Sequence, residues 1–123
     1  MEKNKIKECF DCINDVLTAP AEMIEDKNLK LDRLMILTAL AAEVQGNACA
    51  LYKRKKGEKI RELADEKYSA NQTVLIAEGE VSEYAGMYEH AQRLSAAITH
   101  SIEGIRTQIS LYKTELTNSL IQK

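Results

Sequence analysis

The sequence predicts an all-α protein, a long antiparallel helical hairpin with coiled-coil-like spacing and a short N-terminal helix. Apolar residues recur along most of the chain at intervals of three and four, which is the period of one helix face. Among 123 residues there are one Pro, five Gly and six aromatic residues, whereas sheet proteins need many turn, β-branched and aromatic residues. We expect one helical domain over residues 1–123, with an N-terminal helix and connector in residues 1–27 and the hairpin in residues 28–123.

The N-terminal helix is expected over residues 4–17, because its apolar residues have helical spacing. These residues are Ile6, Cys9, Phe10, Ile13, Val16 and Leu17. Pro20 should end the helix, since proline has no amide hydrogen and clashes with the preceding turn. Residues 21–26 could add one helical turn, with Met23 and Ile24 pointing inward.

A second helix should begin near Asp32, whose carboxylate can cap the free amides of the next turn. Its apolar residues follow a heptad pattern of alternating three- and four-residue steps. That seam consists of Leu34, Leu37, Ala41, Val44, Ala48 and Leu51. Residues 34–44, which include Leu40, are apolar on nearly every side of the helix. A helix that is apolar all round is expected to be buried all round.

The third helix is expected to run without interruption over residues 74–122, because its seam continues for five heptads. Residues 69–73 contain polar capping types before Val74 and form the preferred site for the hairpin turn, with Gly57 as the alternative. Gly79 and Gly86 lie off the main seam, either as surface residues or where a second helix approaches closely. The seam comprises Ala77, Val81, Tyr84, Tyr88, Ala91, Ser95, Ile98, Ile102, Ile105, Ile109, Tyr112 and Leu116.

A two-helix hairpin covers only one stripe of each helix, so this much apolar surface needs additional cover. The N-terminal helix can supply part of it. We expect a second copy to supply the rest, which predicts a homo-oligomer, most simply a dimer or tetramer with a four-helix core.

Charge is uneven along the chain, although the net charge is only −2. Residues 33–61 contain seven basic and two acidic side chains, and six of the basic ones fall within residues 53–61. This basic patch could bind nucleic-acid phosphates, or it could be a solvated stretch near the hairpin tip. It consists of Lys53, Arg54, Lys55, Lys56, Lys59 and Arg61.

Residues suited to catalysis or metal binding are few. Cys9 and Cys12 have the spacing of half a zinc site or a redox pair, but Cys49, His90 and His100 are single and scattered. Packing of Cys9 as a small apolar residue is the better interpretation. We therefore expect no enzyme activity, no catalytic residue, no metal and no cofactor.

The cellular location is expected to be the cytoplasm. No apolar core of a signal peptide follows the N-terminus, and three cysteines without an export signal predict reduced thiols. No uninterrupted apolar run reaches the ~18 residues of a membrane span. We therefore expect no membrane association.

A family resemblance rests on three segments of the hairpin. They are residues 103–116, Ala-Leu-Tyr-Lys at 50–53 and Ala-Glu-Gly-Glu at 77–80. Over residues 45–116 the chain resembles small all-helical proteins of temperate phages and prophages, encoded among replication and recombination genes. The resemblance implies a helical hairpin in the cytoplasm of a bacterial or phage-infected cell, and it carries no catalytic residue over to this chain. We expect a non-enzymatic interaction or scaffold protein, such as a phage accessory factor that binds a protein partner. The alternative is a nucleic-acid-binding helper of phage replication or recombination that uses the basic patch.

Overall fold

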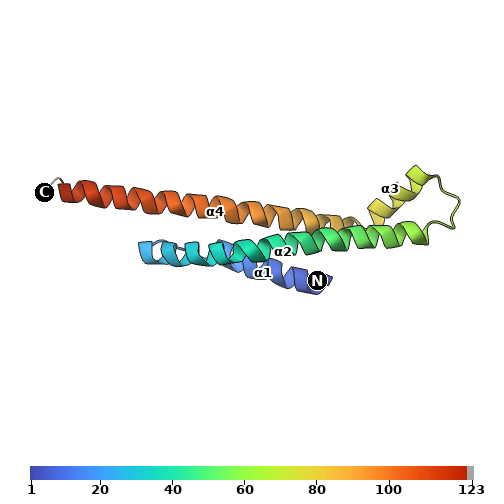
Figure 1. The fold of residues 1–123 in the computed structure, drawn as a ribbon, viewed down its shortest axis with the longest axis horizontal. Helices are drawn as coiled ribbons and strands as arrows, with labels where there is room; N and C mark the ends of the chain where they lie inside the picture. Colours follow the sequence, from blue (N-terminus) through green and yellow to red (C-terminus); the bar gives the residue numbers. More distant parts are fainter. Residues whose placement is uncertain (122–123) are drawn as a thin grey trace.

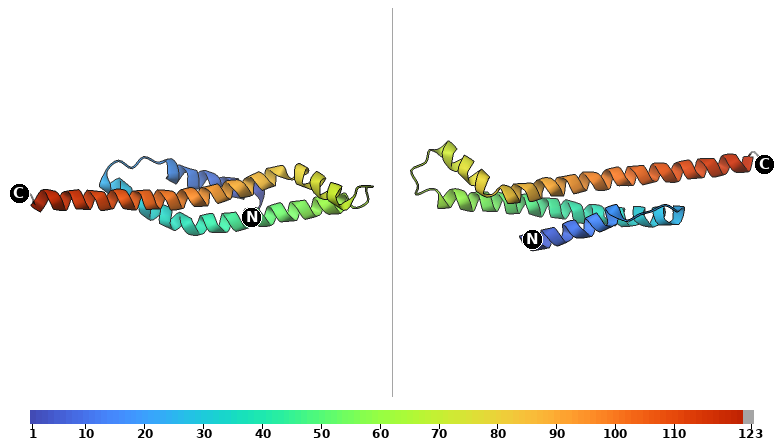
Figure 2. Two further views of the ribbon diagram at one scale, coloured as in Figure 1. Left: turned by 90° about the horizontal axis from the view of Figure 1, so that it is seen from above. Right: turned by 180° about the vertical axis from the view of Figure 1, so that it is seen from behind.

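The computed structural model describes residues 1–121, which form four helices and no strand. The helices are α1 (Lys3–Thr18), α2 (Ile24–Glu62), α3 (Ala70–Glu80) and α4 (Ser82–Ile121). Helices α2 and α4 lie side by side in opposite directions, and α1 packs beside both of them (Figures 1 and 2). The predicted all-α fold, with a long helical hairpin and a short N-terminal helix, is confirmed.

Helix α1 has nearly the predicted bounds and buries the predicted face, with Cys9 and Phe10 inside. The Phe10 ring and the His90 ring of α4 pack nearly perpendicular to each other, with ring centres 4.7 Å apart. At the other end, the Lys30 ammonium group donates hydrogen bonds of 2.8 and 2.7 Å to the carbonyls of Leu17 and Ala19. These bonds satisfy carbonyls that the end of a helix leaves without partners.

Helix α2 begins at Ile24, about two turns before the predicted start at Asp32. Glu25 and Asp26 occupy its first turn, where acidic side chains stabilise the positive end of the helix dipole. Met23 precedes the helix and is exposed, so the prediction that it points inward was wrong. Ile24 is half-buried against the core.

One core joins α1, α2 and α4. The six seam residues predicted for α2 are all buried. On α4 the buried residues include Ile98, Ile105 and Ile109 from the predicted seam, together with Met87 and Leu94 beside it. Four further predicted residues are only partly buried against this core, namely Leu40, Tyr84, Tyr88 and Ile102.

The chain reverses over residues 63–69, and α3 starts earlier than the predicted third helix. The Ser69 hydroxyl accepts a hydrogen bond from the Gln72 amide, and the Gln72 side chain accepts one from the Ser69 amide. Such a capping box fixes where a helix begins. Helix α2 continues through Gly57, so the alternative turn there was wrong.

The predicted single helix over residues 74–122 is interrupted at Val81, which separates α3 from α4. Ala77 before the break and Val81 at the break are both buried, so the apolar spacing continues across it and does not reveal it. Gln122 lies outside the described residues.

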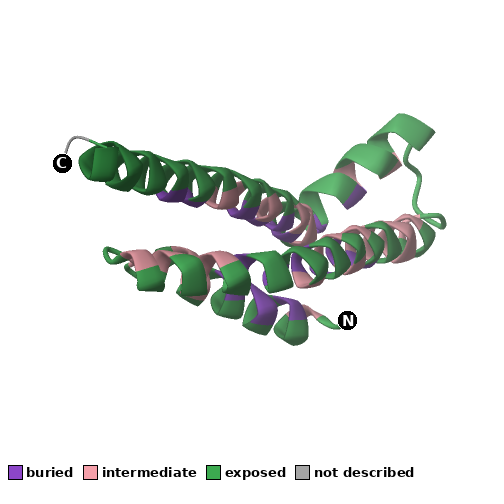
Figure 3. Cartoon of the chain, turned by 60° about the vertical axis from the view of Figure 1, so that its left-hand side comes forward, coloured by how far each residue is buried: buried purple, intermediate pink, exposed green. Residues whose placement is uncertain are grey.

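Two predictions of burial were wrong. Met35 and Ile36 are 48% and 75% exposed, because α1 and α4 cover only part of the circumference of α2. Tyr112 and Leu116 are also exposed. Here α4 extends past the first residue of α2, and its last turns are exposed on all sides (Figures 1 and 3).

Candidate interaction surfaces

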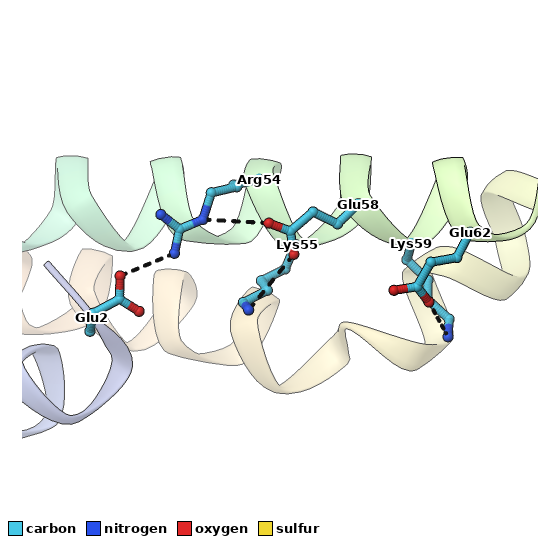
Figure 4. Close-up of polar contacts among 6 residues, drawn as sticks. All are labelled: Glu2, Arg54, Lys55, Glu58, Lys59 and Glu62. Atoms are coloured by element: carbon cyan, nitrogen blue, oxygen red, sulfur yellow. Dashed lines mark hydrogen bonds and ion pairs between the residues drawn. The ribbon is translucent and has the colours of Figure 1, made fainter.

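The basic patch lies on the last third of α2, and much of its charge is paired within the chain. The Arg54 guanidinium lies 3.4 Å from a carboxylate oxygen of Glu2 and 3.9 Å from one of Glu58. Lys55 contacts Glu58 as well (Figure 4). Glu2, which directly precedes α1, and Glu58, on the next turn of α2, therefore both supply negative charge to this patch.

Two lysines of the patch hold the short helix α3 against α2. The Lys56 ammonium lies 2.9 Å from the Glu78 carboxylate, and Lys59 contacts both Glu62 and Glu80. The hydrogen bond to Glu78 raises the pKa of Lys56, and the hydrogen bond to Glu80 is the main cause of the raised pKa of Lys59. These lysines connect elements of the fold.

The net charge of the patch is consequently small. Four of the six basic residues lie at ion-pair distance from five carboxylates, so the six positive and five negative charges together leave one positive charge. Within residues 1–121, Lys53 and Arg61 are the members of the patch without an ion pair. Polyanion binding relies on several uncompensated cations acting together.

Ion pairs also attach the start of α1 to the start of α4. The Lys3 ammonium is 2.6 Å from a carboxylate oxygen of Glu83, and Lys7 lies 3.5 Å from the same oxygen. The hydrogen bond from Lys3 holds the pKa of the Glu83 carboxyl below its ordinary value. This contact and the Phe10–His90 contact fix the position of α1.

The cysteine and histidine residues are dispersed over the structure. Cys9 is buried in the core, as the packing interpretation predicts, while Cys12 is exposed. Cys49 is half-buried beside Tyr88, and a hydrogen bond between them raises the pKa of the Tyr88 hydroxyl. His100 is exposed near Glu103. Among residues 1–121, no three His, Cys, Asp or Glu side chains come together as metal ligands would.

Exposed apolar side chains concentrate at one end of the molecule, where α2 begins and α4 ends. We call this the distal end. Nine of the thirteen large apolar side chains that are exposed in residues 1–121 belong to it. They are Met23, Leu29, Met35, Ile36, Leu111, Tyr112, Leu116, Leu120 and Ile121.

The middle of α2 carries a second uncovered surface. Between Arg33 and Lys53 the only charged residue is Glu43. By length and composition alone, α2 is the one helix of the described chain apolar enough to cross a membrane, with an 18-residue window of mean hydropathy 1.4. Core helices of soluble proteins pass the same test, but only a third of this window is buried here.

Sequence reasoning overlooked two parts of these surfaces. It did not identify Glu2, Glu78 and Glu80 as partners of the basic patch, because they are distant in the chain. It also treated residues 34–44 as core. Glu43, the only charged residue among them, indicated that one side of this segment faces solvent.

Comparisons with protein-family models, with curated proteins and with solved structures find no match to this chain.

Proposed function

We propose that this chain is a non-enzymatic interaction protein that assembles with a second copy of itself through apolar surface that its own helices leave open. The observation that carries this proposal is the concentration of exposed large apolar side chains at the distal end. Soluble monomers rarely expose a large contiguous apolar patch, and such patches mark interaction sites.

The amount of surface supports an assembly of ordinary size. Each of the nine side chains is about half exposed or more. With roughly 75–100 Å² exposed per side chain, about 700–900 Å² of apolar surface is available over the two helices. A stable interface buries about 800 Å² on each partner.

The distal end also continues the internal seam of the protein. Tyr112, Leu116 and Leu120 follow Ile109 at steps of three and four. Tyr112 still lies beside Met23 and Ile24, but α2 has no residue before Ile24 that could cover the two leucines. A helix from another chain that covered these residues would lengthen the bundle without changing its packing pattern.

Nucleic-acid binding through the basic patch receives less support. Surface ion pairs are weak and can exchange, so the pairing alone does not block phosphate binding. The five nearby carboxylates nevertheless leave little positive potential. A phage accessory role, which the resemblance implies, belongs to the same proposal of interaction and adds no site residue to it.

The proposal is tested with matched polar substitutions at exposed positions. Ile36→Gln combined with Leu116→Gln removes apolar side chains from the distal end, whereas Val74→Gln combined with Leu75→Gln removes exposed ones from α3. We expect light scattering after size-exclusion chromatography to show weaker association for the first pair only. Equal masses for both pairs would contradict the proposal. Single-stranded DNA binding by the wild type at about 50 mM salt that is lost on mutating the basic patch would favour nucleic-acid binding through that patch.

A further inference from the structure

The outer face of α2 has the features of a specific contact with another helix. Its central residues, at steps of four and three, are Met35, Ala39, Ala42 and Gly46, and all four are exposed. Asp32 and Lys53 extend the same spacing at the two ends. The segment from 32 to 53 is about 33 Å long as a helix, the length of an ordinary helix–helix contact.

Helices α1 and α4 cover other sides of α2, and α4 borders the outer face at Met35, whose sulfur accepts a hydrogen bond of 3.8 Å from the Arg106 guanidinium. Helix α1 reaches Asn47 through the Met1 amino group and Arg54 through Glu2. Helix α4 covers the seam that contains Leu34 and Val44. An open hollow of about 400 Å³ beside the outer face is lined by Ala42, Gln45, Gly46, Cys49 and Tyr88.

The two ends of the outer face are complementary in charge. Asp32 is acidic and Lys53 is basic, both are exposed, and neither has an ion pair within residues 1–121. Two copies that pair in opposite directions bring Asp32 of each within about one turn of the partner's Lys53. Parallel pairing would place like charges together at both ends.

The same antiparallel arrangement matches side-chain sizes. When Ala39 faces the partner's Ala42, Met35 faces the partner's Gly46 on each side of the two-fold axis. Parallel pairing would instead set Met35 against the partner's Met35 and leave a gap at Gly46. Within residues 1–121, a Cβ added at Gly46 would meet no atom within 4 Å outside its own stretch of helix, so the fold of the single chain does not require glycine there.

We infer that the outer face of α2 is an antiparallel, two-fold symmetric dimer contact with a second copy of this chain. The inference rests on the proposed function, which is self-assembly, and goes beyond it by adding a contact through Met35, Ala39, Ala42 and Gly46, of which only Met35 belongs to the distal end. Small residues at 39, 42 and 46 let the two α2 backbones approach closely. Asp32 and Lys53 set the direction of pairing, and Glu43 lies at the flank of the contact.

The test places a large side chain at Gly46, in the space that the partner's Met35 would occupy. Gly46→Met should fold at least as well as the wild type, because the site is open and methionine favours helix more than glycine does. It should raise the dimer Kd by roughly 100-fold, since overpacking occurs twice in a two-fold contact. Gly86→Met is the matched control, because Gly86 is also exposed with no atom within 4 Å of an added Cβ, and it should leave the Kd unchanged.

Two rescue experiments separate a specific contact from a general effect on the helix. Adding Met35→Ala to Gly46→Met restores the match of large to small and should recover most of the lost affinity. Asp32→Lys and Lys53→Asp should each weaken the dimer, and the combined variant should restore it.

The possible results have distinct meanings. Weakening by Gly46→Met with rescue by Met35→Ala supports the contact. A wild type that associates while Gly46→Met has an unchanged Kd overturns this contact but leaves the proposed function standing. A wild type that stays monomeric up to ~100 µM removes both. Wild type that remains monomeric but binds phosphatidylcholine vesicles would assign the face to lipid and overturn the inference.

Discussion

Two substitutions on the same stripe of α4 test where the core of the single chain ends. Ile98 is 1% exposed within the core cluster, whereas Leu116 is 50% exposed beyond the start of α2. Both lie on the heptad seam that the sequence predicts. Replacing each of them with alanine asks whether the whole seam, or only its first part, stabilises the isolated chain.

The expected losses differ by several-fold. Ile98→Ala removes three buried carbons at about 0.8 kcal/mol each and leaves a cavity, so the free energy of unfolding should fall by about 3–4 kcal/mol. Leu116→Ala removes atoms that no other helix of the chain covers, and alanine is the better helix former. Its effect on the monomer should be less than about 0.5 kcal/mol.

Urea denaturation followed by circular dichroism gives both values, provided that the protein is dilute enough to be monomeric. At high concentration, where copies associate, Leu116→Ala should also weaken association. In the dilute, monomeric protein only its effect on the stability of the single chain is measured. A dilute Leu116→Ala protein that loses as much stability as Ile98→Ala would refute the division of the seam into core and exposed extension.

Three further predictions concern the connections between helices. Ser69→Ala removes the capping box of α3, so it should cost about 1 kcal/mol locally and speed hydrogen exchange at residues 70–73. Lys30→Met leaves two carbonyls at the end of α1 without their charged donor and should lower the free energy of unfolding by about 1–3 kcal/mol in thermal or urea denaturation. Because the pKa of the Glu83 carboxyl is lowered in the folded protein, its contact with Lys3 stabilises the protein at neutral pH and is lost as the pH falls below the ordinary value of 4.5. Glu83→Gln should remove that part of the acid dependence, and a melting profile against pH identical to that of the wild type would contradict this assignment.

The fold could be predicted largely from spacing. The α2 seam from Leu34 to Leu51 is buried because alternating steps of three and four keep one side of a helix against a neighbour. The same rule could not predict the break at Val81, since Ala77, Val81 and Tyr84 keep their spacing on both sides of it.

The exposed surfaces could not be predicted in the same way. Spacing indicates which residues of a helix are apolar, but it does not indicate how many other helices the chain supplies to cover them. Met35 and Ile36 are exposed because α1 is only 16 residues long and lies on another side of α2. The pairing of Lys56 with Glu78 likewise depends on where the chain reverses, which local patterns place only approximately.

Sedimentation equilibrium of the wild-type protein over about 1 to 100 µM tests the central claim most directly, because this range spans the affinities of ordinary weak and moderate dimers. Assembly through the uncovered apolar surface predicts an apparent mass that rises with concentration to at least twice the 13.8 kDa of one chain. A mass of 13.8 kDa at every concentration would contradict it.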